Sequence, residues 1–295
     1  MKTVFLTLKS VTLTGIFEVI KAKFKLVGEF DKIPTNLIKD YISKKNCLEI
    51  GGPTRVFMEG GILPIYKVAK IIDNVNYSQK TIWTDSVESS RERIFNKTIT
   101  NEASNLNKIV NDTYDLVISS NVIEHLSDPL RALLEMKRVI RDDSLIIVIV
   151  PHKDITFDHK REITCLDSLI QYFNEHVKEG EIFHLNLERI YKDYDLAFDP
   201  PAGDLNSFKA RTLENMSNRA LHQTVFNTQL LLEMFNWAKI KILYVRTSLI
   251  IGHILIIGQK SYDPADEIQN FNIHFLSLGA DWRYETVFRS EKTKK

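Results

Sequence analysis

Polar side chains that could transfer a proton follow two apolar runs of the chain. Residues 116–118 are leucine, valine and isoleucine, and the polar stretch 119–125 comes directly after them. Residues 145–150 form a second apolar run, which is also followed by polar side chains. Histidine changes its charge near neutral pH and is the most common general base in enzymes. The predicted candidates for proton transfer are His125, His152, Asp158 and His159.

The two apolar runs have the length of buried strands, and a helix is expected between them. Asp128 is suited to cap a helix, and Pro129 is suited to its first position. Apolar residues recur on one helical face over residues 130–140. Two buried strands joined by such a helix form a right-handed crossover, and ligands bind beyond the carboxyl ends of its strands. We therefore expect His125 and His152 to lie at one edge of a sheet.

A ligand loop is predicted after an earlier strand, residues 46–50, because Gly51 and Gly52 follow it at once. The next strand is expected at residues 68–72 and ends in Asp73. A carboxylate at such a place can accept two hydrogen bonds from the vicinal hydroxyls of a ribose. Neither a GxGxxG motif nor a Walker motif occurs, so the ligand need not be a diphosphate.

The remaining chain divides into a polar segment and a return to strand patterns. Residues 153–222 are charged, aromatic and interrupted by prolines, and Arg161 within them is a candidate for binding an anionic group of a substrate. Residues 240–245 and 250–257 predict a closing antiparallel hairpin. Residues 260–295 have the composition of a polar tail.

The composition is that of a soluble globular protein, with 44% hydrophobic residues, 26% charged residues and a net charge of +1 over 295 residues. This balance gives no indication of a nucleic-acid partner. Cys47 and Cys165 match no metal spacing, so no metal site is predicted, and they indicate a reducing, cytoplasmic compartment. Lysines and Glu18 interrupt the apolar residues of 1–30, which argues against a spanning helix and leaves a lead-in segment or a weak membrane-surface contact.

The order of these motifs resembles the class I S-adenosylmethionine-dependent methyltransferases. The resemblance rests on LEIGG at 48–52, on Asp73, on Glu102 and Ala103, and above all on residues 114–152. A TFDHKREIT stretch at 156–164 resembles in particular the enzymes of bacterial surface-polysaccharide clusters, such as those for capsule or O-antigen.

The resemblance implies an α/β fold. It is a Rossmann-like, seven-stranded, mostly parallel sheet with an antiparallel final strand, helices on both faces and a polar insertion after strand five. The expected domains are lead-in helices at 1–44, a methyltransferase domain at 45–258 with its insertion at about 153–222, and a C-terminal extension at 259–295. The insertion would cover the acceptor side.

The resemblance also implies site residues for S-adenosylmethionine. Glu49, Gly51 and Gly52 would approach its methionine part, Asp73 its ribose, and Glu102 and Ala103 its adenine. Ser120 and Asn121 would form the floor under the sulfonium. Arg161 and His222 would contact the acceptor, a small molecule or glycan. The sequence departs from the family at Pro53, which stands near the place of a third loop glycine.

Three functions remain open at this point. The first is O-methylation of a sugar or phosphate-type group destined for a bacterial surface glycan. The second is methylation of a small metabolite or a nitrogen acceptor, and a neutral amine acceptor needs no strong base. The third is a non-catalytic Rossmann-like partner subunit, which the altered glycine loop would suit. A nicotinamide-dependent dehydrogenase is disfavoured by the missing GxGxxG motif. The oligomeric state does not follow from the sequence.

Overall fold

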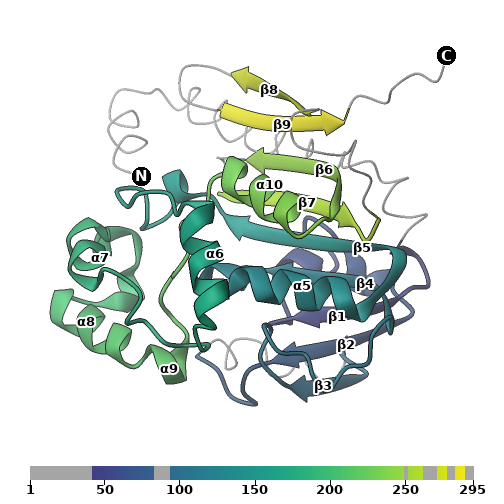
Figure 1. The fold of residues 1–295 in the computed structure, drawn as a ribbon, viewed down its shortest axis with the longest axis horizontal. Coiled ribbons are helices and arrows are strands. Elements are labelled where there is room, and N and C mark those ends of the chain that lie inside the picture. The colour runs from purple at the N-terminus through teal and green to yellow at the C-terminus, as the bar shows by residue number, and fades with distance from the viewer. Residues whose placement is uncertain (1–41, 83–93, 249–251, 262–270, 278–282, 290–295) are drawn as a thin grey trace, which may run out of the picture.

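The computed structural model describes residues 42–82, 94–248, 252–261, 271–277 and 283–289 (Figure 1). The expected helices at 1–44 and the proposed membrane-surface contact lie almost entirely outside the described residues. Among the described residues, no helix is long and apolar enough to cross a membrane.

One sheet forms the centre of the fold. Its strands are β1 (Asn46–Ile50), β2 (Ile71–Asn76), β3 (Lys97–Thr100), β4 (Tyr114–Ser120), β5 (Ile140–Pro151), β6 (Lys241–Ser248), β7 (His253–Gln259), β8 (Phe271–Ser277) and β9 (Arg283–Arg289). Their order is β3-β2-β1-β4-β5-β7-β6-β9-β8. The first five strands in this order are parallel, and β7 runs antiparallel between β5 and β6.

The predicted fold class is therefore confirmed by the seven strands from β3 to β6. Two further antiparallel strands, β9 and β8, extend the sheet beyond β6. They lie in the stretch whose composition predicts a polar tail. The hairpin of β6 and β7 is present as expected, with each strand shifted a few residues toward the C-terminus.

The helices of the described chain are α5 (Pro129–Val139), α6 (Leu166–Glu175), α7 (Leu187–Asp193), α8 (Leu205–Leu213), α9 (Asn215–Asn218) and α10 (Thr228–Trp237). Helices α5, α6 and α10 lie on one face of the sheet (Figure 1). Helix α5 begins as predicted, because the carboxylate of Asp128 accepts a hydrogen bond from the amide of Arg131 at 2.9 Å. The other face packs against short helices η1 (Arg55–Phe57) and η2 (Ile65–Lys67).

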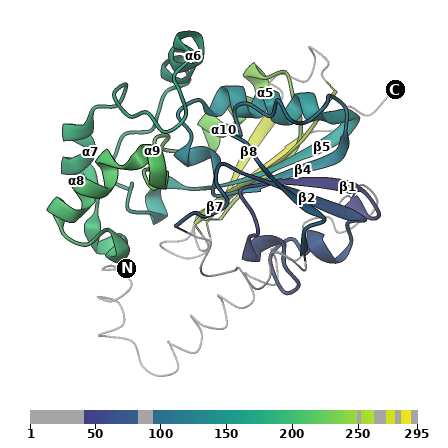
Figure 2. The same ribbon diagram turned by 90° about the horizontal axis from the view of Figure 1, so that it is seen from below.

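The insertion after β5 forms a small body of its own. Its helices α7, α8 and α9 lie beyond the ends toward which the parallel strands point (Figures 1 and 2). It has a separate apolar cluster around Ile190, Tyr194, Phe208 and Leu221. The insertion is thus held together by its own core and stands at the carboxyl edge of the sheet, where ligands bind in such folds.

Candidate active site

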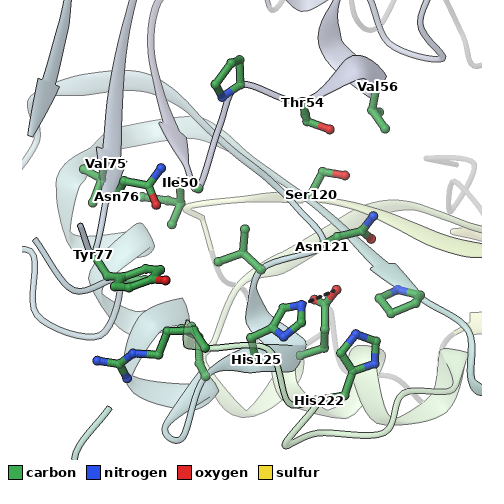
Figure 3. A pocket seen from close by; sticks show the side chains of 18 of the residues that line it. Ile50, Thr54, Val56, Val75, Asn76, Tyr77, Ser120, Asn121, His125 and His222 are labelled. Atoms are coloured by element: carbon green, nitrogen blue, oxygen red, sulfur yellow. Dashed lines mark ion pairs between the residues drawn. The ribbon is translucent and has the colours of Figure 1, made fainter. Parts of the chain in front are cut away.

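A cavity of about 570 Å³ opens at the carboxyl ends of the parallel strands. Figure 3 shows side chains from the loops after β1, β2 and β4 around it, together with His222 from the end of the insertion. Its volume is in the range of small-molecule and cofactor sites. Of the residues predicted for the site, seven line this cavity: Gly51, Glu102, Ala103, Ser120, Asn121, His125 and His222.

The loop after β1 needs both of its glycines. Gly51 has a φ of +85°, and a Cβ there would lie 2.4 Å from Cγ2 of Val122. A Cβ on Gly52 would lie 2.1 Å from the carboxylate carbon of Glu49. Gly51 lines the cavity, whereas Gly52 and Glu49 lie behind it. The direct ligand contact expected for Glu49 is thus not supported.

Glu49 instead stabilises the loop after β1 through hydrogen bonds that involve Tyr66. It is buried, and its Oε2 accepts a hydrogen bond from the Tyr66 hydroxyl at 2.6 Å. The same hydroxyl oxygen accepts the amide of Thr54 at 2.9 Å. Burial and the Glu49 carboxylate raise the pKa of Tyr66, so its hydroxyl keeps its proton as the donor. These two hydrogen bonds hold the loop in place, although Pro53 follows the glycine pair where the family has a further glycine nearby.

The structure does not support the ribose contact expected for Asp73, because β2 continues to Asn76. Asp73 lies inside the strand, does not line the cavity, and is 5% exposed. Its carboxylate accepts hydrogen bonds from the Tyr114 hydroxyl at 2.7 Å and from the Asn96 amide at 2.9 Å. The strand end that faces the cavity carries Asn76 and Tyr77, which sequence analysis missed (Figure 3).

A cation from the insertion closes the cavity beside Glu102. The guanidinium of Arg219 donates a hydrogen bond to Oε1 of Glu102 at 2.9 Å and lies 5.3 Å from the centre of the Tyr77 ring. Burial raises the pKa of Glu102, and Arg219 opposes this rise. Nε and Nη1 of Arg219 are buried without a hydrogen-bond partner in the described part of the chain. Polar atoms of this kind are normally satisfied, which points to a ligand at this wall.

Ser120, the last residue of β4, and Asn121, which follows it, both line the cavity. Asn121 has a φ of +53°, a conformation that asparagine tolerates better than most residues. Its side-chain nitrogen lies 3.3 Å from Nε2 of His253, a residue that the sequence analysis did not single out. The hydroxyl of Ser120 is buried and has no partner among the described residues.

Glu124 and His125 follow in the short helix η4 (Ile123–His125) and meet His222 at the cavity wall. Figure 3 shows the rings of His125 and His222 near each other, and their centres are 4.6 Å apart. Glu124 is 1% exposed, and burial raises its pKa to about 7. Burial and the neighbouring His222 lower the pKa of His125 well below its ordinary value.

Asp158 stands directly behind this group. Nδ1 of His222 lies 2.6 Å from Oδ2 of Asp158, and both residues are buried. Arg161 donates to Oδ1 of Asp158 at 2.7 Å and to the backbone oxygen of His222 at 2.8 Å. Burial alone would raise the pKa of Asp158, but His222 and Arg161 outweigh it and hold the pKa below its ordinary value. Asp158 and Arg161 therefore orient His222 and do not line the cavity.

Two predicted catalytic histidines lie elsewhere. His152 is buried, and its Nδ1 accepts the amide of Asp154 at 3.3 Å at the start of η5 (Lys153–Ile155). His159 lies in the insertion, where its Nε2 is 3.3 Å from a carboxylate oxygen of Asp195. Neither lines the cavity. The structure therefore does not support a proton transfer by either of them at this cavity. After Pro151 the chain runs through the insertion and lines the cavity again at Arg219 and His222.

A family model described as "Methyltransferase domain" matches residues 28–220. The chain belongs to the methyltransferase-domain family. It is an S-adenosylmethionine-dependent methyltransferase, and S-adenosylmethionine is its cofactor. No curated protein matches the chain in sequence.

Several solved structures are similar to this methyltransferase at low sequence identity. One is an S-adenosylmethionine-dependent methyltransferase of Thermotoga maritima, described as a possible histamine N-methyltransferase. It has 17% identity, covers 83% of this chain and 97% of its own, and gives a TM-score of 0.42. A second, from Aquifex aeolicus, has 12% identity, coverages of 80% and 98%, and a TM-score of 0.43. A third is the 1,6-didemethyltoxoflavin-N1-methyltransferase of Burkholderia thailandensis, with 9% identity, 79% of each chain covered, and a TM-score of 0.43.

Proposed function

We propose that this methyltransferase methylates the oxygen of a hydroxyl group on a sugar-like acceptor. The observation that carries the proposal is the buried pair of His222 and Asp158 at the cavity wall, beside Glu124 and His125. A hydroxyl is a weak nucleophile until its proton is removed. A histidine oriented by a carboxylate is suited to accept that proton.

The cofactor belongs in the half of the cavity around Asn76. S-Adenosylmethionine supplies a methyl group that is activated by its sulfonium sulfur. Asn76 would bind the ribose hydroxyls in place of the expected aspartate, and Tyr77, Glu102 and Ala103 would border the adenine. The buried, unpartnered atoms of Ser120 and Arg219 support this fit, because a polar ligand would satisfy them. Gly51 would allow the methionine part to approach the backbone.

The acceptor belongs in the half around His222 (Figure 3). The chain's task is to hold the hydroxyl in line with the methyl group and to take up its proton, which contributes roughly 10²–10⁴-fold in rate. We call Glu124, His125 and His222 the Glu–His cluster. Its position at the cavity wall supports a hydroxyl acceptor over an amine, because a neutral amine is already a good nucleophile before it loses a proton.

A sugar destined for a bacterial surface glycan is the acceptor class that we favour. Its support is the resemblance of residues 156–164 to enzymes of polysaccharide clusters. A phosphate-type acceptor is favoured less, because Arg161 is buried against Asp158 and the backbone of His222. A cytoplasmic reaction on a small precursor, without a nucleic-acid partner, agrees with the two free cysteines and the net charge of +1.

A panel of acceptors with labelled S-adenosylmethionine tests this function. Sugars and nucleotide sugars are paired with their amino-sugar analogues, and methylated product is detected by mass. We expect hydroxyl acceptors to react and His222→Asn to lower kcat by about 10²-fold or more, with S-adenosylhomocysteine affinity unchanged. His159→Asn is the matched control and should keep full activity. Methylation of amines alone, or full activity of His222→Asn, would overturn the proposal.

A further inference from the structure

We propose that the Glu–His cluster binds one divalent transition-metal ion at the acceptor end of the cavity. The three residues come from two distant parts of the chain, because Glu124 and His125 belong to η4 and His222 ends the insertion. The role of the ion in catalysis rests on the proposed function, but the binding site itself does not. No metal site is predicted from the sequence, since the ligands match no short spacing motif.

The ligand atoms already converge. One atom from each of the three residues lies within 4.8 Å of the others, and Nε2 of His125 is 3.9 Å from Oε1 of Glu124. Ligands of a common ion at bond lengths of about 2.0–2.2 Å lie roughly 3–3.5 Å apart. Small side-chain rotations therefore bring all three onto one ion.

The carboxylate of Glu124 is the second observation. The residue is 1% exposed and lines the cavity, and neither of its side-chain oxygens has a hydrogen-bond partner among the described residues. A buried carboxylate without donors is costly, and such groups are normally paired or bound to a metal. A cation between Glu124 and the two imidazoles would satisfy it.

The surroundings of both histidines are those of metal ligands. Metal-binding histidines usually donate their second ring N–H to a carboxylate or a backbone oxygen, which orients the coordinating nitrogen. Nδ1 of His222 lies 2.6 Å from the Asp158 carboxylate, and Nδ1 of His125 lies 3.3 Å from the backbone oxygen of Leu221. In each ring this arrangement assigns the proton to Nδ1 and the lone pair to Nε2.

The ligand set selects the class of ion. Two imidazoles and one carboxylate suit Mn²⁺, Fe²⁺, Co²⁺ or Zn²⁺, whereas Mg²⁺ and Ca²⁺ prefer sites built from oxygen ligands. Three protein ligands leave coordination positions for other groups. Because these positions face the cavity, an acceptor hydroxyl can bind the ion there and lose its proton to water more readily. With the ion bound, Nε2 of His222 is a ligand, so the ion replaces His222 in activating the hydroxyl.

Direct titration of the chelator-treated full chain tests the site. Mn²⁺ and Zn²⁺ are added in separate calorimetric titrations, with Mg²⁺ as the comparison ion. We expect one Mn²⁺ or Zn²⁺ per chain. We also expect affinity to fall by about 100-fold or more in Glu124→Gln and His222→Asn, and by about 10–100-fold in Asp158→Asn.

His159→Asn is the matched control, because its ring lies in the insertion away from the cavity, and it should bind the ion as the wild type does. S-Adenosylhomocysteine affinity and the melting temperature report whether each variant is folded. Absence of stoichiometric binding at about 1 mM Mn²⁺ and Zn²⁺, or equal binding in Glu124→Gln and His222→Asn, overturns the site. These titrations need no acceptor, so a failed acceptor panel would contradict the proposed function without affecting them.

Discussion

Arg219 reaches from the insertion to Glu102 and donates a hydrogen bond to its carboxylate at 2.9 Å, across 117 residues of sequence. The same guanidinium lies over the Tyr77 ring. The insertion thereby forms part of the wall of the cavity half that we assign to the cofactor.

Removing this guanidinium should weaken cofactor binding. For Arg219→Ala we expect S-adenosylhomocysteine affinity to fall about five-fold, since Glu102 is partly exposed and the ion pair is correspondingly weak. Arg211→Ala is the matched control, because Arg211 pairs with Asp199 inside the insertion. It should lower the melting temperature and leave the affinity unchanged. Equal affinities for wild type and Arg219→Ala would show that the contact serves only packing.

Asn76 and Asp73 should respond in opposite ways to substitution. Asn76→Ala removes a neutral hydrogen-bonding group from the cavity and is expected to lower S-adenosylhomocysteine affinity about ten-fold. Asp73→Asn should leave the affinity unchanged but lower stability by about 1–3 kcal/mol, because the Tyr114 hydroxyl and Lys97 lose their carboxylate. Calorimetry and denaturant unfolding measure the two effects. Loss of binding in Asp73→Asn with unaltered stability would restore the ribose role to Asp73.

Gly52→Ala tests the loop after β1. The new Cβ would collide with the Glu49 carboxylate, so either the loop or Glu49 must shift. We expect a stability loss of about 1–3 kcal/mol and a clear loss of S-adenosylhomocysteine affinity. Gly60→Ala meets no atom within 4 Å and should cost about 1 kcal/mol through its φ of +81° alone, with normal affinity. Indistinguishable behaviour of the two variants would argue against the tight loop.

Glu179 should give stability a pH dependence. Burial raises its pKa above the ordinary value of 4.5, although its carboxylate accepts the amide of Ser127 at 3.0 Å. The folded protein therefore holds this proton more tightly than the unfolded chain. Its contribution to stability is complete below about pH 4.5 and is lost as the pH rises through the folded-state pKa. Glu179→Gln should melt progressively higher than the wild type as the pH rises. A constant difference in melting temperature across this range would contradict the assignment.

The fold was predictable because local patterns and sheet topology agree. The apolar cores of β4 and β5, with Asp128 and Pro129 between them, determine a crossover whose strands are covered on both faces. The end of β2 was not predictable in the same way. Its polar residues read as a turn, yet Asn74 and Asn76 are buried and approach the backbone oxygen of Gly52 at 3.4 Å. That contact moves the strand end from Asp73 to Asn76.

The acceptor half of the cavity could not be predicted, because it combines residues that are far apart in the sequence. No local pattern shows that His222, rather than His152 or His159, reaches the cavity. The position of His222 is fixed by its neighbours Gln223 and Thr224, whose amides donate to the backbone oxygen of Glu124 at 2.7 Å and 3.1 Å. Family membership gives no guidance here either, because the matched region ends at residue 220.

The anchoring of Gln223 and Thr224 on Glu124 has a consequence for building chimeras of this enzyme. A crossover placed after residue 224 would transfer the insertion together with Asp158, His222 and the amides of Gln223 and Thr224 that bind the backbone oxygen of Glu124. A crossover at residue 220, the end of the family match, would combine the insertion of one parent with the His222 of the other. His222 would then be separated from the Asp158 carboxylate of its own parent. To exchange substrate range between enzymes, the transferred segment should therefore extend past residue 220, where the family match ends, to residue 224.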